Sequence, residues 1–397
     1  MREDTSKATD GLWQRPLPRR RFVGGTVGAA VGLGLLGQAP SGLAASPAPP
    51  AQTEATPRTP GSTNIVHSNN PPLEETRVEE LVGLLVPTAN FFIRNHSATP
   101  QIDAATWRLR IEGHVERPYE LSYDELRNLP EQRSLFAFLE CAGNGRGRFD
   151  PPADGTPWIM GAAGTAEWTG VPLHVLLERA GVRPGAVDLV CEGGDPAQVT
   201  RGLPMAVAMD PDTMVVWAMN GAPLLPDHGY PVRLLVPRWI GVASVKWLQR
   251  LEVIDRPFDG IYNTVRYVLE GRPSGAPPEP ATLQPVKSYI NRPAPNSTVP
   301  RGQVLITGYA WSGHAPIARV EVSTDGGQSW QEARLLEPRF PLAWVRFDFP
   351  WDAQATGSYT LASRATDEAG NVQPQTVEWN RQGYYMNAIY SFPVTVV

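Results

Sequence analysis

The stretch SLFAFLECAGNGRGR, residues 134–148, contains the pattern on which the rest of the sequence is interpreted. Its first half, residues 134–139, is a short apolar run typical of a buried strand. Its second half is a glycine-rich loop that begins at Cys141, and glycines let a backbone approach a ligand closely. Arg146 and Arg148 would favour a thiolate and attract anions. The pattern therefore favours a reactive or metal-bound cysteine at the end of a buried strand.

Cys141 has two other interpretations that the local sequence leaves open. It can be a small buried residue, or it can form a disulfide with Cys191 in an oxidising compartment. Cys191 ends an apolar run, residues 187–191, which favours core packing for this second cysteine. Two cysteines are too few for a disulfide framework or a multi-cysteine metal cluster. No CxxCH motif occurs, so we expect no haem attached to this chain.

Length and composition exclude several classes of protein. The chain has 397 residues, enough for about two or three domains. Its 37 glycines and 41 prolines favour turns and disfavour a helical bundle. A net charge of −5 without a basic excess argues against binding of nucleic acid. Phosphate-binding glycine loops, zinc-protease motifs and serine-hydrolase motifs are absent from the sequence.

Residues 1–45 have the pattern of an export signal. Three arginines at positions 19–21 precede a soft apolar stretch, residues 24–36, and small residues follow it. Twin arginines at this place predict export by the twin-arginine route to the periplasm or another extracytoplasmic compartment. The apolar run is too short for a membrane anchor, and no later segment favours a membrane span. Residues 46–72 are rich in Pro, Ala, Thr and Ser, which predicts a disordered linker.

Residues 73–270 are predicted to form an α+β domain. Ser122 and Glu125 fit a capping box that opens a short helix. Residues 171–180 have helical spacing and end at Gly181. The expected strands include residues 107–111, 134–139, 187–191 and 232–236.

A second linker is predicted at residues 271–283, after which the chain changes character. Short strands separated by turn signals over residues 283–397 predict an all-β, immunoglobulin-like sandwich without a stapling disulfide. The expected strands include residues 304–306, 317–322, 344–349, 359–364 and 392–396. Tryptophans and tyrosines of this domain could anchor an interface, so we expect it to support a homodimer.

Two further groups of residues could hold an anionic cofactor. Arg94 and His96 follow aromatic residues in the motif FFIRNH, where charge-assisted bonds to an anion are possible. His228, Arg233 and Lys246 could together form a phosphate site, and a lysine stands out in a chain that otherwise uses arginine. The alternative for both groups is a set of ordinary solvated or structural side chains.

Taken together, these motifs resemble the sulfite oxidase family of molybdenum enzymes, in its exported bacterial branch. The resemblance covers residues 85–397. It rests on FFIRNH (91–96), ECAGNGR (140–146), EWTGVPL (167–173), EGGD (192–195), MNGAPLLPDHGYPVRLLVP (219–237), SVKWL (244–248), GYAWSG (308–313), VSTDGGQSW (322–330) and DEAGNVQP (367–374). The resemblance implies a catalytic domain that binds molybdopterin, followed by a domain that pairs subunits.

The resemblance also implies roles for single residues. Cys141 would ligate molybdenum, a metal that a soft thiolate suits. Arg94 and Arg146 would face the substrate oxyanion, which two guanidiniums can hold by forked hydrogen bonds. Trp158 would be the tryptophan of the pocket, and Tyr267 the active-site tyrosine. The residues implied to contact the cofactor are Phe92, Ile93, Arg94, Asn95, His96, Cys141, Asp195, His228, Arg233, Ser244, Val245 and Lys246.

The activity that the resemblance implies is oxidation of sulfite to sulfate, with one molybdenum-molybdopterin per chain. Because we expect no haem on this chain, electrons would pass to an external acceptor such as a c-type cytochrome. Gly145 stands where animal sulfite oxidases carry arginine, and the related sulfane dehydrogenases of thiosulfate-oxidising systems share the ECAGNG form. A sulfane dehydrogenase or an S-oxide reductase with the same cofactor are therefore alternatives. A third alternative is an exported immunoglobulin-like binding protein without a metal.

Overall fold

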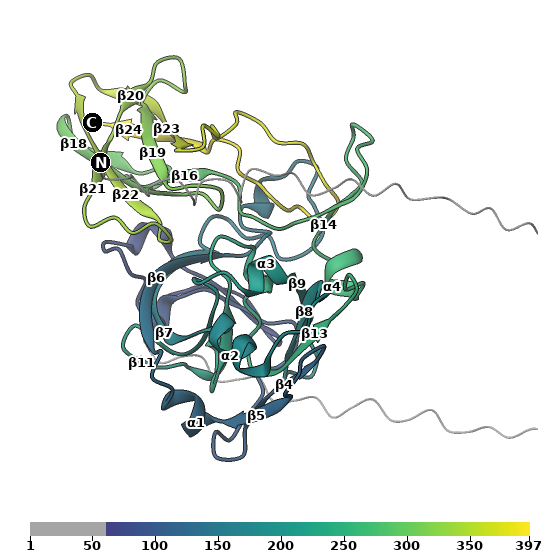
Figure 1. Cartoon of the computed structure of the whole chain (residues 1–397). Coiled ribbons are helices and arrows are strands. Elements are labelled where there is room, and N and C mark those ends of the chain that lie inside the picture. The colour runs from purple at the N-terminus through teal and green to yellow at the C-terminus, as the bar shows by residue number, and fades with distance from the viewer. Residues whose placement is uncertain (1–60) are drawn as a thin grey trace, which may run out of the picture. The chain divides into compact units, whose positions relative to one another are not determined.

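The computed structural model describes residues 61–397, so the predicted export signal and most of the first predicted linker lie outside it. The described chain is built mainly from strands, with a few short helices (Figure 1). The longest of these helices, α2 (Leu173–Ala180), has 8 residues. None of the described helices is long and apolar enough to cross a membrane. The predicted mixture of strands and helices is present, and sheets supply most of its framework.

Two five-stranded sheets form the framework of the first domain. The first has the order β11-β10-β7-β6 with β12 paired to β10, and the second has the order β5-β4-β13-β8-β9. The first contains β6 (Arg133–Glu140), β7 (Ala163–Pro172), β10 (Met214–Met219), β11 (Ala222–Pro223) and β12 (Arg233–Leu235). The second contains β4 (Arg108–Gly113), β5 (Tyr119–Ser122), β8 (Asp188–Gly193), β9 (Thr200–Pro204) and β13 (Leu248–Ile254). The four strand predictions for this domain all overlap with strands of these sheets.

The helices of this domain follow the sequence signals closely. α1 (Tyr123–Arg127) begins with the predicted capping box, in which the Glu125 amide donates to the Ser122 hydroxyl and the Ser122 amide to the Glu125 carboxylate. α2 ends at Gly181, whose φ of 70° is the left-handed conformation that glycine adopts easily. Leu173, Leu176, Leu177 and Ala180 of α2 are fully buried in the core between the two sheets. The short helices α3 (Met205–Ala208) and α4 (Ile261–Thr264) complete the set.

The hairpin of β6 and β7 places the cysteine loop. The two strands pair antiparallel from Arg133 opposite Gly170 to Glu140 opposite Ala163. The last residues of β6 are buried, and Cys141 follows directly, where its amide donates to the carbonyl of Ala162 at 2.9 Å. The loop therefore starts inside the protein and not at its surface.

A small sheet precedes the first domain and corrects the predicted start of the fold. β1 (Ile65–Asn69) lies inside the predicted linker and pairs with β2 (Pro72–Glu75), which pairs with β3 (Ile93–Arg94). The prediction that the linker extends to residue 72 is therefore wrong at its end. Composition missed β1 because this strand is held by ladder bonds and by polar contacts more than by its own apolar side chains.

Two sheets and a shared apolar core form the second domain. Their strand orders are β16-β18-β22-β21 and β17-β24-β23-β19-β20. The first contains β16 (Lys287–Arg292), β18 (Gly302–Trp311), β21 (Arg334–Leu336) and β22 (Val345–Ala353). The second contains β17 (Thr298–Val299), β19 (Ile317–Ser323), β20 (Gln331–Glu332), β23 (Gly357–Asp367) and β24 (Ser391–Val396). Ile306, Phe347, Leu361 and Val394 pack between the sheets, and all five predicted strands are present.

The second domain is joined to the first by more than a linker. The predicted linker contains β15 (Glu279–Pro280), which pairs with β14 (Val268–Leu269). One apolar cluster includes Phe138 and Trp168 from the first domain and Trp311 and Trp344 from the second. Residues 368–390 leave the second sheet, and within them the amide of Tyr385 donates to the carbonyl of Ala142 at 3.0 Å. The cysteine loop is thus in direct contact with the domain that the sequence assigned to dimerisation.

Candidate active site

The cysteine loop presents a free thiol at the wall of two adjoining pockets. Cys141 is 9% exposed and packs against Trp158 and Ala162. Both cysteines are free, so the disulfide alternative is wrong. Cys191 is fully buried in the core of the first domain, where burial raises the pKa of its thiol. Its predicted role in packing is confirmed.

The first pocket gathers the residues expected to contact a cofactor. They come from the segment around β3, the loop before β12 and the segment before β13, with Cys141 at one side. The pocket is lined by Phe91, Phe92, Arg94, Asn95, His96, Leu139, Cys141, Ala142, Asp195, Val199, Asp227, His228, Arg233, Gly241, Val242, Ser244, Val245, Lys246, Trp247 and Tyr267. Of the predicted cofactor contacts, Ile93 is the one that does not line this pocket.

Two cations of this pocket are buried and form no ion pair with a carboxylate of residues 61–397. Burial lowers the pKa of Lys246 to about 7, and Arg233 lowers it further. Burial also lowers the pKa of Arg233 to about 9. Lys246 Nζ donates to Asn95 Oδ1 and to the carbonyl of Asp227, whereas Arg233 donates to the carbonyls of His228 and Ser244. Asp227 and Asp195 line the same pocket and raise the pKa of Lys246, but neither forms an ion pair with it, so an anion such as a phosphate group would find a favourable place here.

The two histidines of the pocket are neutral. Burial lowers the pKa of His228 to about 3, and its Nε2 lies 3.0 Å from the carbonyl of Thr88, which can only accept. Burial and the nearby Arg94 lower the pKa of His96 to about 2. Asp195 accepts from the Ser97 hydroxyl at 3.0 Å and from the Val199 amide at 3.1 Å, so this carboxylate is already engaged in holding the wall of the pocket.

A second, more open pocket meets the first at Cys141. The two share Arg94, His96, Cys141 and Tyr267. The second is lined by Arg94, His96, Cys141, Arg146, Asp154, Gly155, Thr156, Val265, Arg266, Tyr267, Glu270, Arg381, Gln382 and Tyr384. A molecule in this pocket would therefore lie beside the thiol and the two arginines that were predicted to face the substrate.

Arg94 has unused hydrogen-bonding capacity. Its Nη1 is buried and has no hydrogen-bond partner among the described residues. Burial lowers the pKa of Arg94, but Tyr267, Cys141, Tyr384 and Tyr262 together raise it by more, so the net direction is upward and the guanidinium stays charged. A buried, charged donor without an acceptor favours an anionic ligand at this place.

Arg146 is held in one position by neighbours from both domains. Its Nε donates to the carbonyl of Gln382 at 2.7 Å and its Nη1 to the carbonyl of Thr156 at 3.1 Å. A Cβ atom at Gly143 would lie 2.5 Å from the guanidinium carbon. This glycine therefore makes room for Arg146, although the sequence predicted that it would admit a ligand directly.

Tyr267 lies where both pockets meet. Its hydroxyl is 2.9 Å from Nε2 of His96, and its ring stacks on Tyr384 at 5.3 Å between centroids. Burial raises the pKa of Tyr267, so the hydroxyl is neutral. Nearby Tyr262 packs in the same apolar cluster but lines neither pocket, which supports the choice of Tyr267 as the tyrosine of the site. Trp158 is 1% exposed and lies behind Cys141, so it lines neither of the two pockets.

Sequence reasoning missed the contribution of residues 382–384. Tyr384 stacks on Tyr267, and its hydroxyl donates to Gln382 Oε1 at 2.8 Å. The guanidinium of Arg146 lies 5.3 Å from the centre of the Tyr384 ring. The segment lies between β23 and β24, where nothing in its spacing indicates a site. The pair of tyrosines after Gly383 was the one available signal.

Comparisons with known proteins agree with this geometry. The family model of the oxidoreductase molybdopterin binding domain matches residues 96–262, and that of the Mo-co oxidoreductase dimerisation domain matches residues 281–397. Sulfite oxidase of Gallus gallus is 34% identical, over 84% of this chain and 77% of that protein. Mitochondrial sulfite oxidase of Homo sapiens is 36% identical, over 79% of this chain and 62% of that protein.

Two other similar proteins are named for reactions other than sulfite oxidation. A nitrate reductase [NAD(P)H] of Hordeum vulgare is 32% identical, over 79% of this chain and 39% of that protein. The crystal structure of the sulfane dehydrogenase SoxCD from Paracoccus pantotrophus matches with a TM-score of 0.76 and 34% identity, over 83% of this chain and 86% of that chain.

The two matched domains and the pockets that meet at Cys141 define a molybdopterin-binding oxidoreductase. The chain belongs to the sulfite oxidase family, as its motifs predicted. The alternative of a binding protein without a metal is therefore wrong.

Proposed function

We propose that this chain oxidises sulfite to sulfate and passes the electrons to an external acceptor, such as a c-type cytochrome. The meeting of Arg94 and Arg146 beside Cys141 in the second pocket carries the proposal. A small dianion there would accept hydrogen bonds from two guanidiniums. When bound, molybdopterin supplies the two-electron redox chemistry that the reaction needs.

The residues of the first pocket would hold that cofactor. Lys246, Arg233 and the Asn95 amide line a space in which both cations have only carbonyl oxygens as hydrogen-bond acceptors, which suits the phosphate end of molybdopterin. Neutral His228 can offer a ring nitrogen without adding charge. Cys141 would provide the thiolate ligand to molybdenum.

The residues of the second pocket would bind and orient the substrate. Arg94 would donate its free Nη1 to a substrate oxygen, and Arg146 would present a guanidinium whose position is already fixed. Because His96 is neutral, its Nε2 can accept from the Tyr267 hydroxyl and so fix that hydroxyl between the two pockets. These groups position an anion before reaction and so reduce the entropic cost of reaching the transition state.

A sulfane dehydrogenase is the second candidate, because the SoxCD structure matches over more than four fifths of both chains. One assay separates the candidates. The purified, molybdenum-loaded enzyme would be given sulfite, thiosulfate or a persulfide as electron donor, with cytochrome c or ferricyanide as acceptor. We expect the highest kcat/KM with sulfite. Faster turnover of the persulfide would favour the second candidate, and nitrate-dependent oxidation of a reduced dye would overturn both.

Export and self-association belong to the same proposal. Replacing the arginines at positions 19–21 by lysine should trap the precursor in the cytoplasm, since the twin-arginine route reads those arginines. Undiminished export would contradict this route. We also propose that the second domain is an immunoglobulin-like sandwich that supports a homodimer, in agreement with the dimerisation-domain match. Analytical ultracentrifugation of the full chain would test the dimer, and a monomer at micromolar concentration would contradict it.

A further inference from the structure

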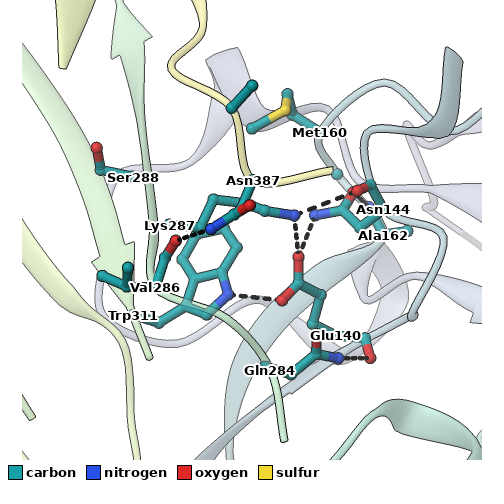
Figure 2. A network of polar contacts seen from close by, with 12 residues as sticks. Glu140, Asn144, Met160, Ala162, Gln284, Val286, Lys287, Ser288, Trp311 and Asn387 are labelled. Carbon is teal, nitrogen blue, oxygen red and sulfur yellow. Dashed lines mark hydrogen bonds and ion pairs between the residues drawn. The ribbon is translucent and has the colours of Figure 1, made fainter. Parts of the chain in front are cut away.

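A buried polar network joins the second domain to both sides of Cys141. Figure 2 shows Glu140 at its centre, between Lys287, Asn144 and Trp311. The side chains of Glu140 and Lys287 are 1% and 2% exposed. The network is therefore withdrawn from solvent, where each of its contacts has a larger effect than at the surface.

Both oxygens of the Glu140 carboxylate accept hydrogen bonds. Its Oε1 accepts from Lys287 Nζ at 2.5 Å and from Asn144 Nδ2 at 3.0 Å, and its Oε2 accepts from Trp311 Nε1 at 2.7 Å. The main-chain carbonyl of Glu140 accepts from Gln284 Nε2 at 2.7 Å. Three of these four donors belong to residues 284–311, outside the first domain. The residue before Cys141 is thus held from the second domain.

Lys287 also holds the loop on the other side of the cysteine. Its Nζ donates to the carbonyl of Asn144 at 3.2 Å, while Asn144 Oδ1 accepts from the amide of Ala162 at 3.1 Å. The main-chain amide of Asn144 in turn donates to the main-chain carbonyl of Cys141 at 2.9 Å. One ammonium group therefore bridges residues 140 and 144, which flank the thiol in the turn.

We propose that Lys287 is a positioning residue for Cys141: from the second domain it fixes the turn that carries the thiol. It acts by bridging Glu140 and Asn144 and touches neither pocket. The importance of this turn for molybdenum rests on the proposed function, but the bridge itself does not. A domain matched to dimerisation then also sets the geometry of the site within its own chain.

Hydrogen exchange on the full chain purified without cofactor tests the bridge directly. In Lys287→Met, amides of residues 140–148 should exchange faster by on the order of tenfold, because the turn opens more often. Arg334→Met is the matched control, since it breaks an ion pair of 2.6 Å with Asp348 inside the second domain and away from this turn. Unchanged exchange at residues 140–148 in Lys287→Met would overturn the proposal.

A double variant separates positioning from simple neutralisation of Glu140. Glu140→Gln/Lys287→Met leaves no unpaired buried charge, so its melting temperature should return toward the wild-type value. We expect exchange at residues 140–148 to remain fast, since the contact with the Asn144 carbonyl is still missing. If the double variant recovered both the wild-type melting temperature and slow exchange at residues 140–148, the proposed bridging role of Lys287 would be wrong. In the loaded protein, the electron paramagnetic resonance signal of molybdenum should shift in both variants and stay unchanged in Arg334→Met.

Discussion

The two pockets that meet at Cys141 are built in different ways. The first is made from segments of one domain, and its cations Lys246 and Arg233 are buried against carbonyl groups. The second is assembled from β3, the cysteine loop, the segment around Tyr267 and residues 381–384 of the other domain. Its Arg146 is held by carbonyls from two distant segments.

The difference separates binding of a permanent group from binding of a transient one. Buried, unpaired cations cost free energy until an anion neutralises them, which suits a cofactor that stays bound. The second pocket is more open, and one unpaired nitrogen on Arg94 is enough to attract an anion that must also leave. Substitutions in the first pocket should therefore change cofactor content, and those in the second should change substrate kinetics.

Cys141 belongs to both pockets, so its loss should have the largest effect. In Cys141→Ser, we expect molybdenum to fall from about one atom per chain to a small fraction and turnover to fall to background, because the soft ligand is gone. Elemental analysis and steady-state assays measure both quantities. Cys191→Ala, at the fully buried cysteine of the core, should keep its molybdenum. Wild-type activity in Cys141→Ser would disprove the ligand assignment.

Arg146→Gln should affect the second pocket alone. Removing one desolvated forked cation costs ~2–5 kcal/mol. Because each ~1.4 kcal/mol is tenfold, kcat/KM for sulfite should fall by tens to thousands-fold. Molybdenum content should not change. Arg148→Gln is the matched control, since Arg148 lies on the same loop, also donates to second-domain carbonyls and lines neither pocket. Equal losses in the two variants would show that the effect is loop stability.

Glu75→Gln should loosen the segment behind Cys141 through the amino-terminal sheet. The Glu75 carboxylate accepts from the amides of Ile159, Met160 and Gly161 at 2.6–2.8 Å and so holds the segment that carries Trp158. Glutamine keeps an oxygen for these three amides, but its amide nitrogen replaces Oε2, which accepts from the Ile159 amide at 3.0 Å and lies 2.9 Å from His67 Nε2. Urea unfolding should show a loss of ~1–3 kcal/mol, the range for hydrogen bonds lost at a charged group. Glu79→Gln, at a side chain that is 40% exposed, should be neutral. Equal stability of the two variants would refute this role.

Sequence patterns predicted the first pocket better than the second. Phe92, Arg94, Asn95, His96, His228, Arg233 and Lys246 occur in short motifs, and all line the first pocket. Such motifs can be recognised in a sequence because each supplies several pocket contacts from adjacent positions. Gln382 and Tyr384 reach the second pocket across a long chain separation, and the pair of tyrosines after Gly383 is the one local signal in their segment.

The fold also divides into features that the local sequence predicts and features that depend on distant segments. Capping at Ser122, the end of α2 at Gly181 and the strands of both domains follow from local preferences. β1 and the contacts of Lys287 do not, because they depend on partners that only tertiary structure brings close. Trp158 illustrates the limit for single residues, since the resemblance placed it at the pocket but could not show that it packs behind Cys141.

The smallest expected effect concerns pH and distinguishes the two pockets electrostatically. The folded pKa of Lys246 is about 7, below its usual value of 10.5. Above pH 7 the unfolded chain therefore binds more protons at this residue than the folded chain, and stability rises with pH. Without cofactor, the free energy of unfolding should increase by about 2 kcal/mol between pH 7 and pH 9. The range stops at pH 9 because Arg233, with a pKa of about 9, contributes above it.

Lys246→Met should abolish the rise, whereas Arg110→Met, at an exposed cation of β4, should keep it. In the loaded protein a bound anion would keep Lys246 protonated and flatten the rise. Parallel pH profiles for wild type and Lys246→Met would show that this lysine stays charged in the empty pocket, and the contrast between the two pockets would then lose its electrostatic basis.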